Sequence, residues 1–326
     1  MSEMKFKLNY KGNSYDLTDF LQNHPGGYNY LKSYKNKEVP EELLKNYHAS
    51  NAAFYLMKEF SESKTRGLGK DQVEGVEDLE HLVDWSKPLL LQVGKLGSMY
   101  TTWVESPVDR PVRLFSNSFL ESVTRTSWYS VVLVWVPIIS FFFYTGFFSY
   151  HDANKGTSQW HVPLIILFGL CLWSIAEYSL HRWLFHLDPK TSPFLITLNF
   201  MIHGIHHKVP FDADRLLFPP LPAGIIGIAF YYLFTWLLPS HMVDLTFGGF
   251  CLGYLIYDMT HFYLHHGCPA AETFLYDLKR YHNKHHFDFK NDGFGVSSPY
   301  WDKVFGTLIY LKGLPKAINW TIPTEF

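Results

Sequence analysis

Cysteine is scarce in this chain and is not arranged for cross-linking. The 326 residues include only three, Cys171, Cys251 and Cys268, which lie in or near apolar segments. An odd number at such positions argues against a disulfide framework. The first ten residues also lack the apolar core of a secretory signal peptide, so we expect none.

An excess of charge of either sign is missing as well. Lys and Arg number 28 and Asp and Glu 30, for a formal net charge of −2 and a pI near 6.8. No basic patch dominates, so we expect no nucleic-acid partner. Hydrophobic residues make up 47% of the chain although the mean hydropathy is only −0.06. The apolar residues must therefore be concentrated in particular segments.

Uncharged apolar runs are concentrated after residue 125. They cover residues 126–150, 156–176, 216–243 and 245–257. A helix of about 20 residues crosses the roughly 30 Å apolar core of a bilayer. The runs therefore predict a four-helix membrane domain, in which the fourth run is the shortest. Two hairpins would join the helices, at residues 151–159 and 239–241.

The basic residues predict the orientation of these helices. The two hairpin turns contain a single basic residue, Lys155. The opposite ends of the helices carry many more: Arg113, Arg125, Arg182, Lys190, Lys208 and Arg215. Because basic flanks favour the cytosolic side, we expect both termini to be cytosolic, together with the histidines described next.

Histidines gather in four spaced boxes at the predicted cytosolic ends. The boxes are His181-X4-His186, His203-X2-His206-His207, His261-X3-His265 and His282-X2-His285-His286. Residues three or four apart lie on one face of a helix, so the last three boxes should each aim their rings in one direction. A regular helix would splay residues five apart, so we expect the helix of the first box to end between its two histidines.

Ten converging imidazoles predict a site for two metal ions. They exceed the four ligands of a structural zinc site, and five nitrogens per metal would leave one octahedral position open. A zinc pair would only generate hydroxide for hydrolysis, whereas a redox-active iron pair could activate dioxygen. Soluble di-iron bundles use Glu-X-X-His ligands, and that motif does not occur in the sequence.

Two carboxylates and several other histidines lie near the boxes. Glu177 precedes His181 by four residues and Asp258 precedes His261 by three, so each could accept a hydrogen bond from the outer nitrogen of a ligand ring. Alternatively, both are interfacial carboxylates at helix ends. The remaining histidines of this part of the chain are predicted not to be ligands: His81, His151, His161, His241 and His266.

The N-terminal residues form a separate small module. Residues 15–21 (YDLTDFL) lead into His24-Pro-Gly-Gly, and His48 follows within an apolar stretch. These features resemble cytochrome b5, although the usual leading helix and strand are shortened. The resemblance implies a b-type haem with His24 and His48 as its axial ligands. Two imidazoles leave the iron no open position, so the module would carry electrons rather than bind oxygen.

The whole chain resembles the fatty acid 2-hydroxylases of the membrane fatty acid hydroxylase superfamily. The resemblance rests on the four boxes, the leading module and residues 84–90 (DWSKPLL), 107–115 (PVDRPVRLF) and 293–302 (GFGVSSPYWD). It implies that the ten box histidines hold two metal ions, iron in the active form, although zinc can occupy the site in purified protein. It also implies hydroxylation at C2 of long-chain fatty acyl groups for ceramide, an NADPH-dependent reductase as electron donor, and residence in the endoplasmic reticulum membrane.

Several alternatives stay open at this point. A sterol methyl oxidase, an acyl desaturase or a carotenoid hydroxylase would use similar boxes, and a haem- and metal-binding membrane electron carrier would have no chemistry of its own. The acyl donor could be a free acid, a CoA thioester or a ceramide. The loop at 293–302 either covers the metal site or packs as a turn.

These patterns predict a mainly α-helical protein with a small α+β part. We expect a cytochrome b5-like domain at residues 1–62 and a linker with a connector at 63–125. Within that connector, residues 81–125 should form short helices on the membrane surface, or else a soluble connection. Residues 126–326 should form the four-helix integral membrane domain, with a helical histidine-rich cap on the cytosolic side.

Overall fold

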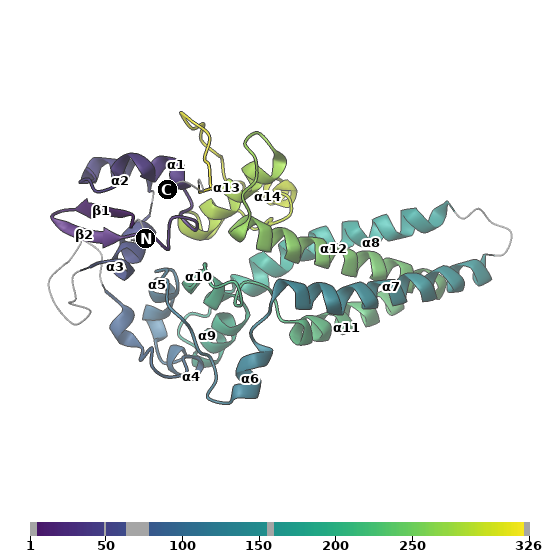
Figure 1. Ribbon diagram of the computed structural model, residues 1–326. Helices are drawn as coiled ribbons and strands as arrows, with labels where there is room; N and C mark the ends of the chain where they lie inside the picture. The colour runs from purple at the N-terminus through teal and green to yellow at the C-terminus, as the bar shows by residue number, and fades with distance from the viewer. Residues whose placement is uncertain (1–4, 49, 63–77, 155–159, 323–326) are drawn as a thin grey trace.

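The computed structural model describes residues 5–48, 50–62, 78–154 and 160–322. A small module of strands and short helices lies at one end, and a bundle of long helices extends from the other (Figure 1). A cap of shorter helices lies between them. Most of the predicted linker, residues 63–77, and residues 155–159 of the first hairpin fall outside the described residues.

The N-terminal module is built around a two-stranded hairpin. Strands β1 (Lys7–Tyr10) and β2 (Asn13–Asp16) pair antiparallel through a turn at Lys11 and Gly12, both with positive φ. Helices α1 (Tyr28–Leu31), α2 (Glu41–Tyr47) and α3 (Ala52–Glu59) follow, with a 3-10 turn, η1 (Lys32–Tyr34), after α1. The apolar sides of the strands and helices share one core, which includes Phe6, Leu8, Tyr10, Leu21 and Phe54. The predicted α+β module is confirmed.

The connector contains short helices, as expected. They are η2 (Glu80–Leu82), α4 (Leu90–Val93), η3 (Gly97–Met99), α5 (Tyr100–Val104) and α6 (Ser118–Val123). The buried side chains of α4, α5 and the loops around them join those of α9 (Pro193–Asn199), η5 (Phe200–Gly204) and α10 (Ile205–Lys208) in one apolar cluster. The ammonium group of Lys208 is fully buried there and donates to Glu80 and to the carbonyls of Trp103 and Ser106, at 2.6–2.8 Å. The connector therefore supports the helix that carries the second histidine box.

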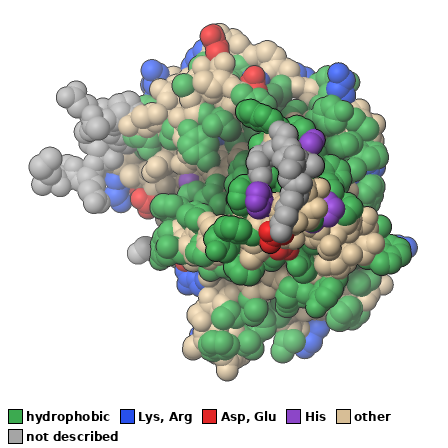
Figure 2. All heavy atoms as spheres, turned by 90° about the vertical axis from the view of Figure 1, so that its right-hand side faces the viewer, with side chains coloured by type: hydrophobic (Ala, Val, Ile, Leu, Met, Phe, Trp, Pro, Cys, Tyr) green, Lys and Arg blue, Asp and Glu red, His purple; other side chains and the backbone are tan. Residues whose placement is uncertain are grey.

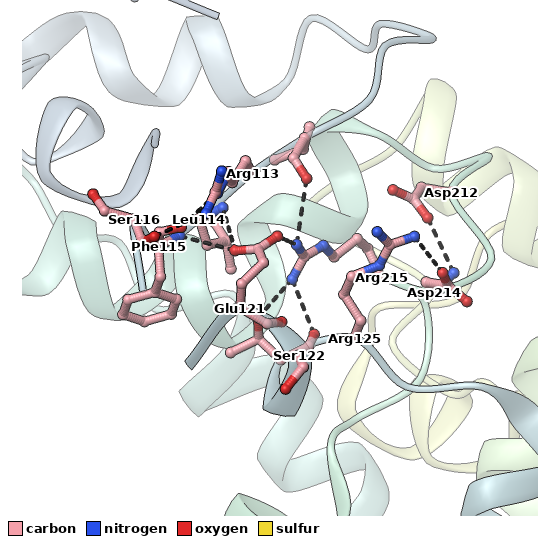
Figure 3. Close-up of polar contacts among 12 residues, drawn as sticks. Arg113, Leu114, Phe115, Ser116, Glu121, Ser122, Arg125, Asp212, Asp214 and Arg215 are labelled. Atoms are coloured by element: carbon pink, nitrogen blue, oxygen red, sulfur yellow. Dashed lines mark hydrogen bonds and ion pairs between the residues drawn. The ribbon is translucent and has the colours of Figure 1, made fainter. Parts of the chain in front are cut away.

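A network of charged groups holds α6 at the base of the bundle (Figure 3). The Glu121 carboxylate accepts from the backbone N–H groups of Leu114 and Phe115, each at 2.9 Å, and pairs with the buried guanidinium of Arg215. Arg125 pairs with Asp214 in the same stretch. These contacts tie the connector to the segment that leads into the third long helix.

The bundle contains four long helices: α7 (Trp128–Ala153), α8 (His161–Ser179), α11 (Pro220–Leu237) and α12 (Ser240–His266). Among the described residues, three helical segments are long and apolar enough to span a membrane: Trp128–Ala153, His161–Phe185 and Pro220–Leu237. Their outward surface is largely hydrophobic when viewed from the hairpin end (Figure 2). The second hairpin lies at Leu238 and Pro239, close to its predicted position.

Helix α12 differs because it is packed among the other three. Fourteen of its 27 residues are buried, so it can be less apolar than a helix that faces lipid. Its glycines allow close helix packing: a Cβ atom on Gly249 would lie 2.2 Å from the Ile166 carbonyl oxygen, and one on Gly169 of α8 would lie 2.1 Å from that of Thr246. The predicted third run, residues 216–243, covers α11 and, after the hairpin at Leu238 and Pro239, the first residues of α12.

Candidate metal centre

The ten box histidines come together in the cap, where the cap meets the membrane helices. They lie on or directly after η4 (Leu180–Phe185), which continues α8, on η5 and α10, on α12, and on α13 (Phe274–Phe287). Their ring nitrogens form two groups of five, within each of which the nitrogens lie no more than 4.8 Å apart. The first group is His181, His186, His203, His207 and His285, and the second is His206, His261, His265, His282 and His286.

The first box shows why a spacing of five is compatible with one site. The helix ends between the two histidines, as the spacing predicted, because its last residue is Phe185 and His186 is the C-cap; its last turn, however, is the π-helical turn η4 rather than a regular one. The backbone N–H of His186 donates to the carbonyl of His181 at 3.0 Å, an i→i+5 hydrogen bond. A π-helical turn places residues five apart on the same side, and the two ring centroids are 4.9 Å apart.

The two HX2HH boxes are each divided between the groups, which corrects the expectation that each box aims in one direction. His203 and His207 belong to the first group, whereas His206 between them belongs to the second. In the same way, His282 and His286 join the second group and His285 the first. Adjacent helical residues point about 100° apart, so the middle ring diverges from its i+4 pair. These two boxes therefore link both groups.

Distances within the groups fit metal coordination. In the first group, the Nε2 atom of His203 lies 3.2 Å from that of His181 and 3.0 Å from that of His207. In the second, the Nε2 atoms of His265 and His282 are 2.9 Å apart. Two imidazoles bound to one metal at about 2.0–2.1 Å and at right angles would have nitrogens about 3 Å apart. The observed separations therefore match neighbouring ligands of one ion.

Buried nitrogens without partners support the same conclusion. The Nε2 atoms of His186 and His285 in the first group have no hydrogen-bond partner among the described residues, and neither do those of His206, His261 and His286 in the second. Leaving a buried polar atom unpaired is unfavourable. A cation that accepts these lone pairs removes the cost, so the residues present fit a metal in each group.

Protonation does not compete with a metal at neutral pH. For His203, His206, His207, His282, His285 and His286, burial holds the pKa well below the ordinary value of 6.5. Neighbouring imidazoles lower these pKa values further. The rings are therefore neutral, and neutral imidazole is the form that binds metals.

Backbone carbonyls orient two rings of the first group. His181 donates its Nδ1 hydrogen to the carbonyl of Phe294 at 2.6 Å, and His285 donates to that of Asp292 at 2.7 Å. This leaves Nε2 of each ring available to the metal. Phe294 belongs to the predicted loop at 293–302, so this loop borders the first group. These two acceptors were not predicted, because a carbonyl group gives no signal in the sequence.

Glu177 and Asp258 do not bond to ligand rings, contrary to one of the two predictions. Glu177 accepts from the backbone N–H groups of Val296 and Ser297 at 3.0 and 2.8 Å, and from the Ser297 hydroxyl. Asp258 accepts from the Tyr254 hydroxyl at 3.1 Å. Glu177 therefore acts indirectly: it holds the loop whose Phe294 carbonyl orients His181.

The remaining histidines lie apart from both groups among the described residues. The His266 ring packs against Phe262 at 4.9 Å between centroids. His81 donates its Nδ1 hydrogen to the carbonyl of Asp78 in the connector. His151, His161 and His241 lie at or near the hairpin ends of the long helices.

An apolar pocket lies between the long helices beside the first group. Residues from all four helices and adjoining segments line it, including Trp135, Trp173, Phe185, Phe218 and Phe250. The Phe185 ring stacks on His203 at 5.2 Å between centroids and on Phe218 at 5.6 Å. One pocket wall therefore touches a histidine of the first group.

In the N-terminal module, His24 and His48 face each other. Their ring centroids are 6.2 Å apart, close to the separation of two imidazoles bound to one ion at about 2 Å each. Nδ1 of His48 donates to the Leu44 carbonyl at 2.9 Å, leaving Nε2 free. Burial and the second imidazole lower the pKa of His24 to about 3, so its ring is neutral. The pair therefore fits a bis-imidazole haem iron.

Two family models match separate parts of the chain. A family model described as fatty acid hydroxylase matches residues 166–307, and one described as cytochrome b5-like haem/steroid binding domain matches residues 7–85. The first match contains all ten box histidines, and the second contains His24 and His48.

Individual relatives cover most of the chain. Fatty acid 2-hydroxylase of Rattus norvegicus is 37% identical over 93% of this chain and 91% of its own length. A dihydroceramide fatty acyl 2-hydroxylase of Arabidopsis thaliana is 40% identical, over 72% of this chain and 97% of its own. The solved hydroxylase domain of scs7p is 34% identical with a TM-score of 0.64, over 71% of this chain and 86% of that one. The chain therefore belongs to the fatty acid 2-hydroxylase family, as a membrane hydroxylase preceded by a cytochrome b5-like domain.

Proposed function

We propose that this protein is a di-iron monooxygenase that hydroxylates C2 of long-chain fatty acyl groups for ceramide synthesis. The observation that carries the proposal is the apolar pocket between membrane helices, one wall of which touches the first of two five-histidine groups. The names of the rat and plant relatives support 2-hydroxylation and an acyl or dihydroceramide substrate for those proteins.

The ten box histidines would hold the two ions, and a redox-active pair such as iron would supply the activation of dioxygen. The chain's own contribution is to keep these rings neutral, buried and correctly turned. The carbonyls of Asp292 and Phe294 orient two rings, and Glu177 holds the loop that carries them. Such supporting contacts hold the rings in the orientation that metal binding requires.

Selectivity for C2 would follow from where the pocket meets the histidines. An acyl chain lying along Trp135, Trp173 and Phe250 would extend into the membrane, with its polar head at the cap. The carbons next to the head would then lie beside the first group. Transfer from lipid into the pocket gains little hydrophobic free energy, so contacts of the head group must fix the position of C2.

His24 and His48 would hold a b-type haem as an electron carrier. Two axial imidazoles would leave the iron no open position for oxygen, so the haem would only transfer electrons. An NADPH-dependent reductase is the proposed donor to this haem. The proposed division of the chain places the haem domain at residues 1–62, the linker and membrane-surface connector at 63–125, and the hydroxylase domain at 126–326.

The proposed location is the endoplasmic reticulum membrane, with both termini in the cytosol. The basic residues support this orientation, because Arg182, Lys190, Lys208 and Arg215 lie at the cap end of the helices, and such residues favour the cytosolic side. Protease should reach tags at both termini in sealed microsomes. Protection of either tag would contradict the orientation.

Mass spectrometry of the acyl product tests the reaction. Purified protein loaded with iron and haem would receive NADPH, reductase, labelled dioxygen and either a free fatty acid, an acyl-CoA or a ceramide. We expect one labelled oxygen atom at C2 of the chain, and none with His285→Ala. His241→Ala, outside both groups, is the matched control and should retain activity. A double bond, an oxidised sterol or a product without label would reject the proposal.

A further inference from the structure

The N-terminal module is fastened to the cap by the C-terminal segment. The backbone N–H of Tyr28 donates to the Asn319 carbonyl at 3.0 Å, and the indole N–H of Trp320 donates to the Pro25 carbonyl at 3.0 Å. Pro25 directly follows His24, so the segment holds the loop that carries this histidine.

A second contact joins the module to the cap on the side of the metal groups. Phe211 and Phe287, both from the cap, pack against the apolar core of the N-terminal module. Phe287 directly follows His286, a member of the second five-histidine group. The module therefore contacts the end of α13, next to a histidine of the second group.

Aromatic rings connect the two sites without interruption. The His24 ring lies 5.9 Å from that of Phe20, which lies 5.2 Å from Phe211, measured between centroids. Phe211 stacks on Phe287 at 6.1 Å, and Phe287 lies 6.0 Å from His286. Each step is a direct contact between neighbouring rings.

A hydrogen bond reaches the same residue from Ser50, close in sequence to the other histidine of the module. The Ser50 hydroxyl donates to the Phe287 carbonyl, and Ser50 lies two residues after His48. Both histidines of the module therefore connect to Phe287, one through rings and the other through the backbone.

We infer that the contact between Phe211 and Phe287 is the route by which the haem module delivers electrons within the same chain, and that they arrive first at the second five-histidine group. The inference rests on the proposed function. Each transfer moves one electron: haem iron is oxidised from Fe(II) to Fe(III), and one iron of the second group is reduced from Fe(III) to Fe(II). No bond is made or broken, and an external one-electron reductant restores the haem.

Phe211→Leu tests the route, because it removes the ring while keeping an apolar side chain of similar size. Fully oxidised protein with haem and iron would receive one electron by photoreduction without oxygen, and the haem absorbance would then be followed. We expect haem reoxidation to slow severalfold in this variant. Phe60→Leu is the matched control, because Phe60 also packs on Phe20 at 4.8 Å but belongs to the module itself.

Three further measurements separate a route from a structural role. The haem spectrum, the iron content and the rate of haem oxidation by added ferricyanide should be the same in Phe211→Leu and in the unmodified protein. If Phe211→Leu fails to hold haem, Phe287→Leu removes the other ring of the same contact and should also slow reoxidation. Reoxidation at the unmodified rate in either intact variant overturns the inference.

Zinc distinguishes failure of the inference from failure of the proposed function. Protein loaded with haem and zinc should keep its haem reduced, because zinc accepts no electron. If the iron-loaded protein also keeps its haem reduced, the proposed function and the inference both fail. If iron-loaded protein reoxidises its haem and Phe211→Leu does so equally fast, only the inference fails.

Discussion

The two groups of five histidines use the same ligand type but differ in how the backbone presents them. Three members of the first group lie on or directly after the π-helical turns η4 and η5, and two of its rings are oriented by carbonyls of a loop. The second group lies on the regular helices α10, α12 and α13. π-helical turns are often found at functional sites, and here they occur in the group beside the apolar pocket.

The surroundings of the groups differ in the same sense. The pocket touches both groups, through Phe185 at His203 and through Tyr257 at His261, whereas Phe287, which contacts the N-terminal module, adjoins His286 of the second group. Substrate and electrons would then reach the centre from different sides. Each HX2HH box contributes histidines to both groups within one helical turn. The two groups are therefore separate sites held by the same short helical segments.

Removal of one ligand from each group should have the largest effect. His285→Ala in the first group and His282→Ala in the second should each lower hydroxylation by more than about 100-fold, since even contacts outside the ligand set cost about 10–100-fold. Metal analysis should show about one ion per chain in each variant and two in the unmodified protein. Loss of both ions from either variant would show that the groups do not bind metal separately.

Glu177→Ala should weaken metal binding by the first group alone. The loop at Val296 and Ser297 loses its acceptor, so the Phe294 carbonyl no longer holds the His181 ring in place. We expect about a 10–100-fold loss of affinity in the first group, measured by competition with a chelator. Asp258→Asn is the control, because the Asp258 carboxylate bonds to Tyr254; an equal effect from this variant would contradict the role given to Glu177.

Acidification should destabilise the metal-free protein below about pH 6.5. The histidines of the two groups outside the membrane helices have pKa values well below 6.5 when folded, so the unfolded chain binds more protons in that range. The free energy of unfolding therefore falls as pH decreases below about 6.5 and is constant above it with respect to these groups. Thermal unfolding with and without bound metal checks this, because metal should shift the loss to lower pH. A flat profile from pH 7.5 to 5 in the metal-free protein would disagree.

The smallest effect is expected from the ion pair between the N-terminal module and the connector. The guanidinium of Arg110 donates to both oxygens of Glu59, at 2.6 and 2.7 Å. Because the arginine is partly exposed, Arg110→Gln should cost about 1 kcal/mol or less. Hydrogen exchange should show slightly weaker protection of α3, with unchanged metal content in both groups. Loss of metal from the second group in this variant would mean that docking of the module and metal binding are coupled.

The sequence alone identified the histidines that gather in the structure, because residue type and spacing can be read directly from it. Ten imidazoles at intervals of three, four and five residues predicted a site of two metals, and His24-Pro-Gly-Gly with His48 predicted a second kind of site. Uncharged runs predicted the long helices because a bilayer requires such runs. Helix α12 is the least apolar of the four, since its neighbours rather than lipid cover it.

Only the tertiary structure decided which histidine belongs to which group. Spacing determines the directions of side chains around one helix, but the packing of α8, α12 and α13 determines what lies in each direction. For this reason His206 and His207, adjacent in sequence, join different groups. Three other features could likewise not be predicted from the sequence: the π-helical turn at His181, the carbonyls that orient two rings, and the contact between Phe211 and Phe287. They depend on backbone geometry and on contacts between segments far apart in the sequence, which residue identity and spacing do not encode.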